Sequence, residues 1–68
     1  KPIDGILFFS PSGVKSYVQE NKIHHEICFC IGETTAEALK NITEKIIIAD
    51  KPSVENLVEK AIRFYNKN

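Results

Sequence analysis

Three short segments of this 68-residue chain combine hydroxyl side chains with turn-forming residues. They read SPSG at residues 10–13, GETT at residues 32–35 and DKPS at residues 50–53, and each follows an apolar run. Hydroxyl groups and the unpaired backbone N–H groups at the start of a helix bind anionic oxygens through partial positive charge. A carboxylate or a phosphate is therefore the kind of ligand that such turns recognise.

Helix capping explains part of this pattern without any ligand. Ser10 suits the N-cap of a helix, Pro11 suits the first helical position, and Ser53 is the corresponding cap of the third turn. A cap is worth about 1 kcal/mol, which is reason enough for Ser53. The first turn adds a second hydroxyl at Ser12 and a glycine at Gly13, where a ligand can approach the backbone closely. Capping alone and an anion site both remain open for that turn.

The second turn presents the same choice. Thr34 and Glu37 fit the capping-box pattern. In this pattern a Thr or Ser side chain caps the helix, and the side chain of a Glu three residues later accepts a hydrogen bond from the backbone N–H of that Thr or Ser. Thr35 is a further hydroxyl that this box does not need. If these helices begin side by side at one sheet edge, their surplus hydroxyl and amide donors form one anion site.

The remaining reactive side chains suggest structure rather than chemistry. Cys28 and Cys30 stand two residues apart in an apolar run, so they share one face of a strand and are expected to be buried as small hydrophobic residues. His24 and His25 precede that run and are expected to lie in a solvated loop. Zinc needs four converging ligands, so no metal site is predicted. Asp50 is the only acid placed for a site, and a loop carboxylate before a helix explains it better.

Three apolar runs, at residues 6–9, 27–31 and 46–49, precede the three turns. None of them alternates with polar residues, so each is predicted to be a strand buried on both faces. Between and after them, apolar residues follow a helical period. The predicted helix stripes are Val14, Tyr17 and Val18; Thr35, Ala38, Leu39 and Ile42; and Val54, Leu57, Val58, Ala61, Ile62 and Tyr65.

The order β-α-β-α-β-α predicts an α/β fold with a parallel sheet and right-handed connections, as in doubly wound domains. Three strands are few for such a sheet, and both edges would be open. We therefore expect this segment to be one part of a larger domain, completed by chain not present here.

Composition excludes several classes of function. Nine basic and nine acidic residues give no net charge, so no nucleic-acid partner is expected. The longest apolar run has five residues, at 27–31, whereas a membrane-spanning helix needs about 20, so no membrane partner is expected. Two cysteines do not form a disulfide framework, and we expect a reducing, cytoplasmic setting.

Taken together, three segments resemble the C-terminal part of the uroporphyrinogen-III synthase family. They read DGILFFSPSGV at residues 4–14, IGETTAEAL at residues 31–39 and ADKPSVENL at residues 49–57, and the likeness extends to about Tyr65. Members of that family have two α/β domains, and their C-terminal segment completes the domain that the N-terminus begins. The resemblance implies that residues 1–68 are the C-terminal portion of a single flavodoxin-like domain in a larger two-domain protein.

The resemblance also implies an activity. Members of the family are lyases that cyclise hydroxymethylbilane, a linear tetrapyrrole with eight carboxylates, to uroporphyrinogen III with inversion of ring D. No metal or organic cofactor is expected, the implied partner is this small-molecule substrate, and a monomer is favoured. Half of the cleft between the domains would be missing from the 68 residues, so the isolated segment is expected to be inactive.

The same resemblance assigns substrate-binding roles to two of the turns. Thr34 and Thr35 match the family's T-T turn and are expected to make hydroxyl contacts. Ser10, Ser12 and Gly13 match its S-P-S-G turn, where Ser12 and Gly13 are expected to contribute backbone N–H groups. No catalytic residue is assigned, because the tyrosine that the family places in its other domain has no counterpart here.

One departure from the family pattern concerns the second turn. Glu33 stands where many relatives have proline, and a carboxylate there would repel a polyanion if it faced the cleft. Two other functions stay open: a non-catalytic α/β module that binds a carboxylated ligand, and a structural subunit that pairs through an exposed strand edge. A receiver-type module would need an acidic cluster, and Asp50 is its only candidate.

Overall fold

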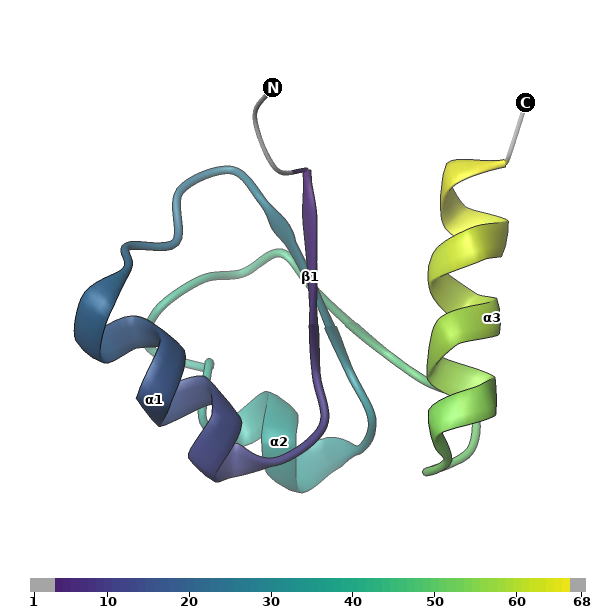
Figure 1. Ribbon diagram of the computed structural model, residues 1–68, viewed down its shortest axis with the longest axis horizontal. Coiled ribbons are helices and arrows are strands. Elements are labelled where there is room, and N and C mark those ends of the chain that lie inside the picture. The colour runs from purple at the N-terminus through teal and green to yellow at the C-terminus, as the bar shows by residue number, and fades with distance from the viewer. Residues whose placement is uncertain (1–3, 67–68) are drawn as a thin grey trace.

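The computed structural model describes residues 4–66, in which a three-stranded parallel sheet carries helices on both faces (Figure 1). The predicted order β-α-β-α-β-α is confirmed. Its elements are β1 (Gly5–Phe8), α1 (Pro11–Glu20), β2 (Ile27–Cys30), α2 (Glu33–Glu37), β3 (Ile46–Ile48) and α3 (Val54–Tyr65). No helix in this part of the chain is long and apolar enough to cross a membrane.

The sheet has the order β1-β2-β3, so β2 is the central strand. Cys28, Phe29 and Cys30 of β2 are 0% exposed, which confirms a strand buried on both faces. The outer strands also contribute side chains to both faces, but apart from Phe8 they are only half-buried, because each has a neighbouring strand on one side only. All of β3 is half-buried, and Phe9, predicted in the first strand, lies beyond its end and is 47% exposed.

One face of the sheet is covered by α1 and α2. The side chains of β2 alternate between the two faces, and Cys28 and Cys30 both point to this one. They pack there with Val14 of α1 and with Leu39, which follows α2. The edge of the Tyr17 ring meets Phe8, with ring centroids 5.7 Å apart.

The opposite face is covered by α3. Phe29, the alternate residue of β2, packs with Leu57 of α3 and with Ala49. Its ring meets Phe64 edge-on, with centroids 5.6 Å apart. One strand therefore anchors two hydrophobic clusters, one on each face.

The second helix is shorter than its predicted stripe. After Glu37 the chain continues in tight turns, in which the Leu39 N–H donates to the Ala36 carbonyl and the Ile42 N–H to the Leu39 carbonyl. These bonds span three residues rather than the four of an α-helix, which rotates the following side chains away from the helical stripe. Leu39 stays buried, but the prediction that Ile42 packs with it is wrong, because Ile42 is 43% exposed.

The stripe predicted for the third helix is only partly correct. Leu57 is buried and Ala61 half-buried, as expected. Phe64, which lay outside the predicted stripe, packs on the sheet beside them. The other members are exposed, although the ring of Tyr65, at the C-terminal end of α3, lies with its centroid 5.9 Å from that of Phe29. They are Val54, Val58, Ile62 and Tyr65, and the expectation that Tyr65 belongs to the core is wrong.

Leu39 and Ile42 provide a matched test of this packing. Leu39→Ala removes a fully buried side chain and should lower the free energy of unfolding by about 2–5 kcal/mol, enough to unfold most of a domain this small. Ile42→Ala, in the same turn segment, should lower it by less than about 1 kcal/mol. Urea unfolding followed by circular dichroism measures both, and equal losses would contradict the placement of Leu39 in the core.

Candidate ligand-binding site

The first predicted turn forms the N-terminus of α1. Ser10 is the N-cap, as predicted, and Pro11 occupies the first turn. The Gly13 N–H donates to the Ser10 Oγ over 3.0 Å, and that Oγ lies 3.2 Å from the Ser12 Oγ. The cap therefore takes up the Gly13 amide, and the exposed Ser12 offers the remaining N–H of this turn together with a hydroxyl.

The second turn forms the N-terminus of α2 in a different way. Gly32 is the N-cap and no side chain caps this helix, so the predicted capping box of Thr34 and Glu37 is wrong. The helix starts too early for the box, because the Ala36 N–H already donates to the Gly32 carbonyl over 3.1 Å. Thr34 consequently lies within the first turn rather than at its cap.

The open N-terminus of α2 is a feature that the sequence analysis missed. The N–H groups of residues 33–35 have no carbonyl one turn earlier in the helix and no side-chain cap. A glycine at position 32 was the available signal, because glycine has no side chain with which to cap a helix. Thr34 is exposed beside these amides, whereas Thr35 is only 3% exposed.

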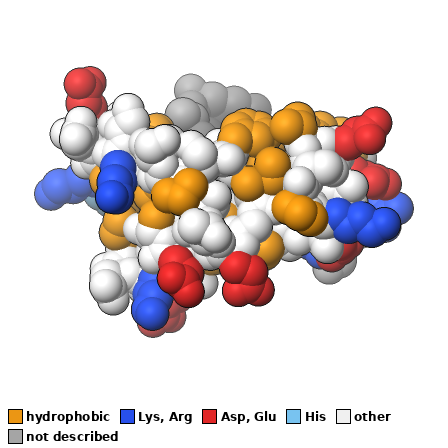
Figure 2. Space-filling model, turned by 90° about the horizontal axis from the view of Figure 1, so that it is seen from below, with side chains coloured by type: hydrophobic (Ala, Val, Ile, Leu, Met, Phe, Trp, Pro, Cys, Tyr) orange, Lys and Arg blue, Asp and Glu red, His pale blue; other side chains and the backbone are white. Residues whose placement is uncertain are grey.

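All three helices begin at the same edge of the sheet, at the carboxyl ends of the strands (Figure 1). Because β1 and β2 are neighbours, the turns that follow them are neighbours as well. The second and third turns also meet, since a Cβ placed on Gly32 would lie 4.0 Å from the Cβ of Pro52. The predicted residues of the first two turns are therefore brought together at the edge that Figure 2 views.

Ser53 in the third turn has the capping role predicted for it. Its Oγ accepts a hydrogen bond from the Asn56 N–H over 3.2 Å and another from the Asn56 Nδ2 over 2.9 Å. This helix N-terminus is thus satisfied by the protein itself, unlike that of α2.

The first two turns contain no cationic side chain, and the third contains the exposed Lys51. Glu33 lies exposed in the first turn of α2, where it interacts favourably with the helix dipole but adds negative charge. Asp50 follows β3 and pairs with Lys60, with 3.1 Å between the Asp50 Oδ1 and the Lys60 Nζ. The first two turns therefore present N–H groups and hydroxyls rather than cationic side chains.

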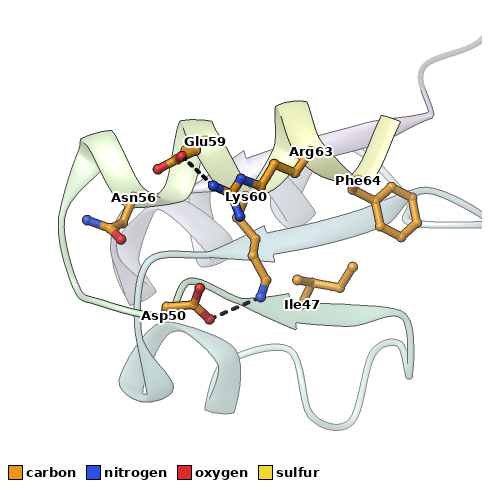
Figure 3. A pocket seen from close by; sticks show the side chains of 7 residues that line it. All are labelled: Ile47, Asp50, Asn56, Glu59, Lys60, Arg63 and Phe64. Carbon is orange, nitrogen blue, oxygen red and sulfur yellow. Dashed lines mark hydrogen bonds and ion pairs between the residues drawn. The ribbon is translucent and has the colours of Figure 1, made fainter. Parts of the chain in front are cut away.

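A groove of about 310 Å³ runs between α3 and β3 (Figure 3). Its charged side chains are already paired with each other: Lys60 with Asp50, and Arg63 with Glu59 over 3.1 Å. The groove thus offers no excess positive charge to a carboxylate, and it includes none of the five predicted binding residues. Its lining is Ile47, Asp50, Asn56, Glu59, Lys60, Arg63 and Phe64.

The cysteines are placed for packing rather than for reaction. Cys28 and Cys30 are buried and unbridged, as predicted. Burial raises the pKa of the Cys30 thiol to about 11, with a further contribution from Cys28. Burial likewise raises the pKa of Cys28, so neither thiol forms a nucleophilic thiolate near neutral pH. His24 and His25 are exposed, as expected, and residues 4–66 contain no cluster of three or more metal-ligating side chains.

Parallel strands with helices on both faces, and three helix N-termini at one edge, define a doubly wound α/β protein. The family model of uroporphyrinogen-III synthase HemD matches residues 1–59, and the chain belongs to this family. It is also similar to the crystal structure of uroporphyrinogen-III synthetase from Helicobacter pylori, with a TM-score of 0.83 and 28% sequence identity. That match covers 94% of this chain and 32% of the other, so the chain spans about a third of this relative. No curated protein matches it.

The raised thiol pKa predicts a pH dependence of stability. The pKa of Cys30 is about 11 in the folded chain against an ordinary value of 9.0. Below pH 9 the thiol is protonated in both states and its contribution is complete. Between about pH 9 and 11 only the unfolded state ionises, so the free energy of unfolding falls as the pH rises.

Urea midpoints between pH 8 and 10.5 measure this effect. The native sequence should lose stability more steeply with pH than Cys30→Ala, in which other titrating groups are unchanged. Parallel slopes would contradict burial of the thiol.

Proposed function

We propose that these 68 residues form part of a uroporphyrinogen-III synthase and bind carboxylates of hydroxymethylbilane at the edge where the helices begin. The observation that carries this proposal is the uncapped N-terminus of α2 beside the serine-rich turn of α1. Membership of the synthase family supplies the substrate, whose eight carboxylates are the anionic oxygens that such an edge suits.

The reaction needs positioning more than strong acids or nucleophiles. Loss of the terminal hydroxyl as water leaves an electrophilic azafulvene. Ring D of the same molecule attacks it to form a spiro intermediate, which rearranges to the product with ring D inverted. The protein has to hold the chain so that this route is faster than direct closure to isomer I. Neutral N–H and hydroxyl donors of the protein would bind the carboxylates on the substrate's side chains. The linear tetrapyrrole would then be held in place while its pyrrole rings stay free to rearrange.

Four of the five predicted residues have distinct parts in this proposal, and the fifth, Ser10, caps α1. Thr34 is exposed and supplies a hydroxyl, whereas Thr35 is buried and supplies chiefly its backbone N–H. Ser12 supplies an N–H and a hydroxyl. The Gly13 N–H is held by the Ser10 Oγ, so it is not free for the substrate. Gly13 contributes instead by having no side chain, which lets the substrate approach the backbone closely.

The protein in this proposal is larger than the segment described. The 68 residues are the C-terminal portion of one α/β domain of a two-domain, monomeric, cytoplasmic enzyme. The segment alone has no activity, because the other wall of the cleft is missing.

Product analysis tests the function. The longer polypeptide that carries these residues is given freshly made hydroxymethylbilane, and the oxidised products are separated into uroporphyrin I and III. A product dominated by isomer III is expected. Isomer I alone, formed at the rate of the enzyme-free control, would refute the proposal and favour a non-catalytic module for a carboxylated ligand.

Thr34→Val tests the proposed hydroxyl contact in the same polypeptide. Loss of one hydrogen bond to a charged group, worth about 1.5–3 kcal/mol, should lower kcat/KM at least about tenfold or lower the ratio of isomer III to I. The fold should persist, since Thr34 is exposed and caps nothing. Ser16→Ala, on an exposed part of α1, is the control. Unchanged kinetics and product ratio would remove Thr34 from the site.

A further inference from the structure

The third turn contains a lysine to which neither the fold nor the proposed function assigns a role. Lys51 is exposed between the end of β3 and the N-cap of α3. It is the only cationic side chain in the three turns at residues 10–13, 32–35 and 50–53. Lys51 is therefore the one cationic group that these turns themselves offer to an anion.

The backbone of Lys51 is held in place from both sides. Pro52 restricts it toward an extended conformation, because the proline ring would collide with a helical residue before it. The Ser53 N–H donates to the Lys51 carbonyl over 2.8 Å, which closes a tight bend ahead of α3. The Ala49 N–H donates to the Cys30 carbonyl over 2.9 Å and ties the end of β3 to β2. The side chain of Lys51 therefore starts from a fixed point at this edge of the sheet.

This starting point lies beside the second turn. A Cβ placed on Gly32 would be 4.0 Å from the Cβ of Pro52, the residue after Lys51. Gly32 is the N-cap of α2, and Thr34 is exposed in the first turn of that helix. Consecutive Cα atoms are about 3.8 Å apart, and the lysine side chain is a flexible four-carbon stem. The ammonium group of Lys51 can therefore reach a carboxylate that is bound at the second turn.

The nearby acidic groups of the protein do not neutralise Lys51. Asp50, its neighbour in the chain, pairs with Lys60 instead, with 3.1 Å between the Asp50 Oδ1 and the Lys60 Nζ (Figure 3). The other ion pair among residues 4–66 joins Arg63 to Glu59. Within this described part of the chain, Lys51 thus forms no ion pair, and its charge is available to a ligand.

Glu33 is the reason why the second turn needs a cation beside it. Glu33 is exposed in the first turn of α2, so its carboxylate adds negative charge to the turn that contains Thr34. Like charges repel, and the proposed substrate has eight carboxylates. A neighbouring ammonium group offsets the charge of Glu33 and attracts the polyanion.

We propose that Lys51 binds a carboxylate of the tetrapyrrole beside the second turn. Its ammonium group donates hydrogen bonds to that carboxylate, and its charge offsets that of Glu33. This inference rests on the proposed function, in which the substrate is hydroxymethylbilane. The carboxylates lie on the side chains of the substrate, away from the carbons that react, so the contact is equally strong before and during the reaction. Lys51 then contributes to affinity and not to the turnover of bound substrate.

Steady-state kinetics of the polypeptide as its gene encodes it test this contact. At low ionic strength, Lys51→Gln should raise KM about two- to fivefold, the effect of one exposed ion pair, and leave kcat and the ratio of isomer III to I unchanged. Lys51→Arg keeps the charge and should keep KM. The difference between Lys51→Gln and the native protein should vanish near 1 M salt, where charges are screened within about 3 Å.

Lys22→Gln is the matched control. Lys22 is exposed two residues after α1, at the other end of that helix from the turns. Its replacement removes the same charge and should leave KM unchanged. A KM that Lys51→Gln does not raise, or that Lys22→Gln raises equally, would overturn the proposal.

Lysine acetylation, measured by mass spectrometry, tests the same contact without catalysis. The cyclised octacarboxylate uroporphyrin III is the probe. It should slow acetylation of Lys51 at least about threefold relative to Lys22, because a carboxylate beside the amine favours its charged, unreactive form. Equal rates at the two lysines, or protection of Lys15 in α1 in place of Lys51, would overturn the proposal.

Isomer analysis on the same sample keeps the two hypotheses apart. Isomer III formed by a protein in which Lys51 is neither protected nor needed for a low KM refutes this contact alone. Protection of Lys51 without isomer III refutes the synthase function alone.

Discussion

The side chains of β2 alternate between the two faces of the sheet, and those of Cys28, Phe29 and Cys30 are withdrawn from solvent on both. A strand buried in this way needs a hydrophobic layer above and below it. The two crossovers within this segment run in one direction, so they place α1 and α2 on one face only. The cover for Phe29 has to come from α3, which returns across the opposite face after β3.

This two-sided cover also creates the binding edge, because every helix that follows a parallel strand begins at the same end of the sheet. The three helix N-termini are not equivalent. Ser10 and Ser53 satisfy those of α1 and α3, so these serines chiefly stabilise the fold. At α2, Gly32 leaves the first-turn amides open to a ligand. The three turns look alike in sequence, but two of them contain a serine that caps its helix and one leaves its helix uncapped.

Local rules succeeded where neighbouring residues decide the structure. Apolar runs and helical periods predicted all three strands and their order, and Ser10 and Ser53 are caps because capping involves only the next few residues. The second turn was mispredicted because Thr34 and Gly32 compete for the cap, and the backbone path decides which of them takes it. Ile42 was mispredicted because tight turns after α2 break the helical period.

The stripe on α3 fails for a different reason. Periodicity reports that a helix face will be covered but not what covers it, so Val58 and Leu57 have the same signature although only Leu57 meets the sheet. An exposed apolar surface that nothing among residues 4–66 covers is expected where other parts of the polypeptide complete the same domain.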